Sequence, residues 1–166
     1  MATYPILRRL PVSHSYQIGR VITQWAVVEW QLKSVANLLL GVSLGARGIR
    51  TARAADYITM YEDLIKLRKM KVRTDLKVLK RALKDIEADR ILIAHGVWLK
   101  HPSRKTPYIQ LTKGKRQAAS TLGSNCVIDP GMVPVTVKNL RDLVRSINIA
   151  SRALSILEVE IQQGID

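Results

Sequence analysis

The chain has 166 residues, of which 47% are hydrophobic and 24% charged, a globular single-domain composition that excludes collagen-like and low-complexity chains. Its 27 Lys and Arg residues exceed its 13 Asp and Glu residues, so the net charge of +14 attracts anions such as nucleic acid. A single cysteine excludes an intrachain disulfide, and polar interruptions in residues 21–44 argue against a membrane-spanning helix, so we expect one cytoplasmic domain over residues 1–166 without a membrane partner.

The first predicted helix runs from Ser15 to Leu40. Its apolar residues recur at alternating steps of three and four, as in a helix that packs against others: Ile18, Ile22, Trp25, Leu32, Ala36 and Leu39. Glu29 falls in the same series, and a buried carboxylate requires a partner. The glycine-rich segment 41–48 lacks the strand and the Lys-Ser/Thr pair of a phosphate-binding loop, so we interpret it as a linker.

Two further helices are predicted, one over residues 49–70 and one from Thr74 onward. The second helix has Ala54, Ile58, Tyr61 and Ile65 in helical register. In the third helix, Thr74 is the expected N-cap and Asp75 lies in the first turn. Its inward series contains Leu76, Leu79, Leu83, Ile86, Ile93 and Val97. Arg90 takes a core-facing position in this series, as Glu29 does in the first helix.

The remaining elements are a β-hairpin and a final helix. Residues 97–100 and 108–111 are predicted strands joined across 101–107, because Gly96 can end the third helix. Residues 113–134 are interpreted as a loop with a short strand near 126–128, and the last helix runs from Thr136 to about residue 163. The predicted fold class is mainly α: a four-helix up-and-down bundle with a short β-hairpin insertion between helices 3 and 4.

The segment 88–98 carries the most specific pattern in the chain. Arg90 is followed by four residues and then by His95, near the end of a predicted helix. This spacing resembles the R-x4-6-H motif of the HEPN (higher eukaryotes and prokaryotes nucleotide-binding) superfamily, and the Trp25-x3-Glu29 and Ala94-His-Gly-x-Trp98 patterns are similar to small bacterial and phage HEPN-like proteins. This spacing alone is not specific, because Arg9-x4-His14 matches it too. The Arg9 match differs in its context, since Pro11 lies within it and no helical periodicity surrounds it.

The resemblance implies a metal-independent endoribonuclease that acts as a homodimer on RNA, in a toxin or defence system with a possible cognate antitoxin protein. The ribose 2′-hydroxyl would attack the adjacent phosphate, with no metal or other cofactor. His95 would transfer protons, Arg90 would hold the phosphate and Glu29 would orient Arg90. In an ideal helix Arg90 and His95 are about 140° apart, so two motifs in one dimer cleft are implied.

A non-catalytic interpretation remains open beside this one. Arg90 and Glu29 would then form an ion pair that fixes helix register, and His95 would bind the last carbonyls of its helix. The protein would be a helical module that binds nucleic acid or another protein. The acidic residues 85, 87 and 89 are interpreted as a solvated face and not as a metal site.

Cations are concentrated between residues 66 and 84, where nine Lys and Arg side chains accompany one acid, Asp75. Five of them are predicted to bind nucleic acid and are called the basic stripe: Arg73, Lys77, Lys80, Arg81 and Lys84. The three tryptophans, Trp25, Trp30 and Trp98, are expected in the core because they lie on or beside apolar seams.

Overall fold

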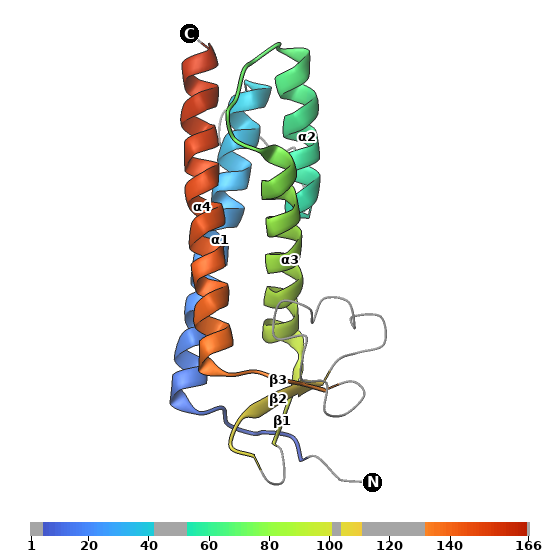
Figure 1. Cartoon of the computed structure of the whole chain (residues 1–166), viewed down its shortest axis with the longest axis vertical. Helices are drawn as coiled ribbons and strands as arrows, with labels where there is room; N and C mark the ends of the chain where they lie inside the picture. Colours follow the sequence, from blue (N-terminus) through green and yellow to red (C-terminus); the bar gives the residue numbers. More distant parts are fainter. Residues whose placement is uncertain (1–4, 42–52, 101–103, 111–131, 166) are drawn as a thin grey trace. The chain divides into compact units, whose positions relative to one another are not determined.

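The computed structural model describes residues 5–41, 53–100, 104–110 and 132–165, which form four helices and a three-stranded sheet (Figure 1). In chain order these are α1 (Val12–Leu40), α2 (Ala54–Leu67), α3 (Leu76–His95), β1 (Val97–Lys100), β2 (Pro107–Gln110), β3 (Met132–Pro134) and α4 (Val137–Ile165). The predicted class, a helical bundle with a β insertion between α3 and α4, is confirmed. The chain forms two compact units: unit 1 contains Met1–Thr23 and Asp85–Arg145, and unit 2 contains Gln24–Lys84 and Ser146–Asp166.

Unit 2 is a helical unit whose apolar core is crossed by buried polar contacts. The Tyr61 hydroxyl of α2 donates a hydrogen bond to the carbonyl of Leu32 in α1, and burial strongly raises the pKa of this tyrosine. The buried Gln31 donates to the Ser155 hydroxyl over 2.8 Å, and Ser34 donates to Glu158 over 2.7 Å. These pairs satisfy polar groups that would otherwise be costly to bury, and they fix the register of α1 against α4.

The helix directions in unit 2 differ from the up-and-down order predicted. Gln31 contacts Ser155 and Ser34 contacts Glu158, so α1 and α4 run parallel. Helix α2 also runs parallel to α1, since Tyr61 lies beside Leu32 while Arg68 lies beside Gly41 (Figure 1). The linker predicted at 41–48 lies, except for Gly41, outside the described residues.

The inward face of helix α1 matches the predicted one only in part. Its buried apolar residues in unit 2 follow steps of three and four through Trp25, Val28, Leu32, Val35 and Leu39. The predicted series shares Trp25, Leu32, Ala36 and Leu39, but it also contained Ile22 and Glu29, which are exposed. Two series fit the spacing, and the helix buries the one without a charged residue, because an unneeded buried carboxylate is costly.

The helix ends are set by local hydrogen bonds. Asp75, and not the predicted Thr74, caps α3, because its Oδ1 accepts hydrogen bonds from the backbone N–H groups of Lys77 and Val78, both over 3.0 Å. Thr136, where the last helix was predicted to begin, is the N-cap of α4, since its Oγ1 accepts the N–H of Asn139 over 3.1 Å. Helices α1 and α2 begin at residues 12 and 54, three residues earlier and five residues later than predicted.

Unit 1 contains the sheet, in the order β1-β2-β3 with both pairs antiparallel. The β1–β2 pairing confirms the predicted hairpin, and Trp98 pairs with Ile109. Strand β3 lies in the segment interpreted as loop, because pairing of Ile109 with Val133 stabilises a short strand that its own sequence does not predict. The strand predicted near 126–128 lies outside the described residues.

Candidate functional site

The two residues of the R-x4-H pattern lie on the last turns of α3 in unit 1. His95 is the final residue of the helix and its side chain is exposed. Arg90 is half-buried and has an interaction partner, so only part of its guanidinium faces solvent. Because both residues share one regular helix, the offset of about 140° between them is retained. A second copy of the motif would be needed to bring an Arg and a His together over one phosphate.

The buried charge on this part of α3 is Asp89 and not the predicted Arg90. Asp89 is 3% exposed and lies among Ile86 and Ile93, which are also buried. Steps of three and four connect residues 86, 89 and 93, so Asp89 occupies the inward position and Arg90 lies at its edge. Asp89 has an interaction partner, as expected for a carboxylate removed from water.

Glu29 belongs to unit 2, on α1, and is exposed. Its Oε1 accepts a hydrogen bond of 2.6 Å from the indole N–H of Trp25, four residues earlier on the same helix. Burial raises the pKa of the nearby Tyr57 hydroxyl, and the negative charge of Glu29 raises it further. The Glu29 carboxylate therefore binds the indole of Trp25 on the same helix. A role of Glu29 in orienting Arg90 stays a prediction.

The tryptophans differ in their surroundings. Trp25 is 3% exposed and lies in the core as predicted, with its polar N–H satisfied by Glu29. The prediction is wrong for Trp30, which is 59% exposed on α1, and Trp98 of β1 is half-buried.

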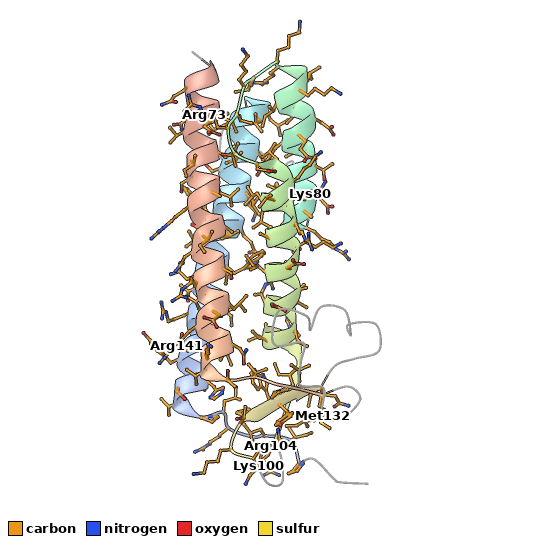
Figure 2. The ribbon with its side chains drawn as sticks, viewed as in Figure 1. Arg73, Lys80, Lys100, Arg104, Met132 and Arg141 are labelled. Carbon is orange, nitrogen blue, oxygen red and sulfur yellow. The ribbon has the colours of Figure 1, made fainter. Side chains whose placement is uncertain are left out.

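The basic stripe lies in unit 2, on the linker before α3 and on the first half of that helix. Figure 2 labels two of its residues, Arg73 and Lys80. Lys77, Arg81 and Lys84 are exposed, and their spacing of four and three residues places them on one face of α3. Arg73 precedes the helix and is also exposed. Lys80 is half-buried and forms a 3.5 Å salt bridge with Glu62 of α2, so its charge is partly neutralised within unit 2.

The acidic residues of α3 do not share one solvated face. Asp85 is exposed, Glu87 is half-buried and Asp89 is buried, which separates the two aspartates expected on one side of the helix. Across the described ranges, no three His, Cys, Asp or Glu side chains are grouped so that they could hold a metal ion.

His14, which the sequence placed outside any helix, lies in the first turn of α1 and is 7% exposed. Its Nε2 lies 3.0 Å from the carbonyl of Val135, so it connects α1 to the segment before α4 within unit 1. The helix begins directly after Pro11, whose fixed φ suits a helix start. This histidine has a structural contact and is not part of a surface site.

Comparisons with protein-family models, curated proteins and solved structures find no match to this chain. Within the described part of the chain, no helix is both long and apolar enough to cross a bilayer.

Proposed function

We propose that this protein binds RNA through the phosphate backbone, with the exposed face of α3 formed by Lys77, Arg81 and Lys84 as the main contact. The observation that carries this proposal is the excess of positive charge on that face, where three exposed cations recur over two helical turns and one exposed acid, Asp85, follows them. Arg73 adds a fourth exposed cation beside the start of α3. Lys80 contributes less, because its salt bridge to Glu62 offsets its charge.

Backbone contacts of this kind have a measurable signature. Each phosphate that a Lys or Arg side chain neutralises releases counterions, so log K falls as log salt rises, by about 0.7 per contact on a single strand. Such contacts carry no sequence information, and binding is expected to be similar for RNAs of different sequence.

The test replaces the three exposed cations by Lys77→Glu, Arg81→Glu and Lys84→Glu in one variant. We expect weaker binding to every labelled single-stranded RNA tested, and a salt slope reduced by about 2 because three contacts are lost. Fluorescence anisotropy at several salt concentrations measures both quantities. The matched control is Lys138→Glu, Arg141→Glu and Arg145→Glu, three exposed cations of α4 with similar spacing, which changes the net charge by the same amount.

Equal losses in the two triple variants would show that net charge alone attracts RNA and would overturn the assignment to α3. Unchanged binding in the α3 variant would overturn it as well. A parent protein that binds anionic phospholipid vesicles but not RNA would identify a membrane surface as the partner in place of RNA.

The second proposal is that Arg90 and His95 cleave the bound RNA, as the resemblance to HEPN proteins implies. The observation that favours it is the exposed imidazole at the end of α3, five residues after a half-buried guanidinium. An exposed imidazole can exchange protons with an RNA hydroxyl near neutral pH, and a guanidinium donates paired hydrogen bonds to a phosphate. A toxin or defence role with a cognate antitoxin is part of this second proposal.

We expect RNA cleavage in the presence of EDTA, with a 2′,3′-cyclic phosphate on the product. Arg90→Ala and His95→Ala should each reduce the rate by at least about 100-fold, the contribution usual for a positioned acid or base. Circular dichroism checks that both variants fold, and anisotropy checks that both still bind RNA. Cleavage unaffected by either substitution, or abolished by EDTA, would contradict the proposal and leave RNA binding as the function.

A further inference from the structure

Unit 1 contains a cavity of about 650 Å³ between its N-terminal segment and the residues around the β1–β2 connection. Five cations contribute to its wall: Arg8, Arg9, Lys100, Arg104 and Lys105. No acidic residue is among the described residues that line it. Proline residues 5, 11 and 107 and two aliphatic residues supply most of the remaining surface.

Backbone hydrogen bonds hold the two walls of this cavity together. The N–H of Leu7 donates to the carbonyl of Trp98 over 2.8 Å, and the N–H of Lys100 donates to the carbonyl of Pro5 over 3.0 Å. Ile6 forms an antiparallel bridge with Leu99, so the N-terminal segment lies along the free edge of β1 (Figure 1). Backbone pairing with β1 therefore fixes the part of the cavity wall formed by residues 5–7.

Within the described ranges, no acidic side chain offsets the charges around the cavity. All five cationic side chains are exposed, and none forms a salt bridge to another described residue. Figure 2 shows Lys100 and Arg104 extending outward from the region of the strands. Arg104 donates a 3.3 Å hydrogen bond to the Tyr108 hydroxyl, which orients its guanidinium. Five like charges around one cavity repel each other, so an anion with several charges stabilises the arrangement when it binds.

We propose that this cavity is a binding site for clustered phosphate groups, either of a free nucleoside polyphosphate or of a 5′-phosphorylated RNA end. Guanidinium groups recognise phosphate oxygens through paired hydrogen bonds, and three arginines are available here. The volume lies in the usual range for small-molecule sites, about 300 to 1,000 Å³, and the proline surface suits the uncharged part of a nucleotide. The proposal is independent of the RNA binding assigned to α3, because the two sites lie in different units.

The experiment measures binding by isothermal titration calorimetry with five probes: inorganic triphosphate, ATP, adenosine, a short RNA with a 5′-phosphate, and the same RNA with a 5′-hydroxyl. We expect triphosphate and ATP to bind and adenosine not to bind. The test variant is Arg9→Gln with Arg104→Gln, and we expect its Kd for triphosphate to rise by about tenfold or more, because two charge-assisted contacts are lost. The control variant, Arg141→Gln with Arg145→Gln, removes the same charge from α4 and should bind as the parent does.

The RNA probes distinguish the two sources of phosphate. A 5′-phosphate that strengthens RNA binding in the parent, and not in the Arg9/Arg104 variant, supports a nucleic-acid end as ligand. Tight ATP binding without that preference supports a free nucleotide. We expect the 5′-phosphate preference, or the binding of ATP, to be kept in the Lys77/Arg81/Lys84 variant. The cavity proposal can therefore fail while the RNA contact on α3 stands, and the reverse is also possible. Triphosphate and ATP affinities that are equal in the parent, test and control proteins would overturn the proposal.

Discussion

Gly96 connects α3 to β1 at a point where a side chain has no space. A Cβ atom built on this residue would lie 2.4 Å from Cγ2 of Ile109 and 2.4 Å from the carbonyl oxygen of Leu92. The same carbonyl accepts the N–H of Gly96 over 2.7 Å, so the backbone cannot move away without losing a hydrogen bond. The close approach of helix and sheet in unit 1 thus depends on a residue without a side chain.

We predict that Gly96→Ala lowers the free energy of unfolding by about 2 kcal/mol, the cost of overpacking against fixed atoms. The control is Gly19→Ala in α1, where a new Cβ would meet nothing within 4 Å. That substitution should raise stability by about 0.5 to 1 kcal/mol, because alanine loses less conformational entropy in a helix than glycine does. Urea denaturation followed by circular dichroism measures both, and equal effects of the two substitutions would contradict the packing argument.

Lys69 adopts a left-handed conformation with φ of 55° at the end of α2. The following residue, Met70, donates its N–H to the carbonyl of Ile65 over 3.0 Å, the closing hydrogen bond of a helix-ending motif that usually contains glycine at this point. In this conformation the Cβ atom of a lysine lies too close to the backbone, a steric strain that glycine does not have.

We predict that Lys69→Gly raises the free energy of unfolding by about 0.5 kcal/mol, the relief of strain less the greater entropy of an unfolded glycine. Lys69→Ala keeps the Cβ and should not produce the gain. Chemical denaturation of the two variants separates backbone strain from removal of the charge. Stabilisation by alanine equal to that by glycine would show that charge repulsion among the neighbouring cations is the cause.

At the scale of elements, the start of α3 depends on Asp75. Its carboxylate accepts two backbone N–H groups of the first turn, while Thr74 donates its hydroxyl to Glu160 of α4 over 2.8 Å. We predict that Asp75→Ala lowers stability by about 1 kcal/mol and that Asp75→Asn restores most of it, because an amide oxygen also caps. Thermal unfolding measures the stability of each variant.

RNA affinity provides a second measurement on the same variants. Asp75 is the one acid between residues 66 and 84, so its removal should leave RNA binding unchanged or strengthen it while stability falls. Parallel losses of stability and binding would show instead that the exposed face of α3 requires the capped first turn.

The sequence predicted the types of the elements better than it predicted which face of a helix is buried. Helix α4 starts within one residue of the prediction because Thr136 is a local N-cap signal, and the β1–β2 hairpin follows from alternating residues between turn signals. The face of α1 was assigned only partly correctly, because two three-four series share Trp25, Leu32 and Leu39. Choosing the series without a charge would have placed Glu29 at the surface.

The candidate site residues could be predicted only where they lie close together in the sequence. Arg90, His95 and the cations of α3 lie on one helix, so their spacing is visible in the chain. The basic cavity joins Arg9 to Arg104 and was missed, since pairing of residues 5–7 with β1 is a long-range contact without a sequence signal. Parallel packing of α1 and α2 was missed for the same reason.

At the scale of the whole molecule, the net charge of +14 opposes the compact state and favours association with polyanions. The α3 face and the basic cavity place exposed cations in both compact units. Stability measured at low salt should therefore rise when RNA or triphosphate binds, since a ligand that prefers the folded state stabilises it.

The homodimer remains a prediction, and Trp30 is the residue on which to test it. Its side chain is 59% exposed on α1, next to Val27, which is 43% exposed. Tryptophans of this kind are enriched among the residues that dominate protein interfaces. Cleavage by Arg90 and His95 would also require two copies, since one helix separates these residues by about 140°.

We predict that sedimentation equilibrium finds a dimer for the parent protein and a monomer for Trp30→Glu. An exposed side chain contributes little to the core, so the unfolding free energy of the monomer itself should change by less than about 0.5 kcal/mol. If two motifs form one active cleft, the variant should lose RNA cleavage while the cations of α3 still bind RNA. Trp30→Phe keeps an aromatic contact and should preserve dimer and cleavage. A parent protein that sediments as a monomer at every concentration would contradict the dimer, and cleavage retained in monomeric Trp30→Glu would show that a single Arg90–His95 motif is sufficient.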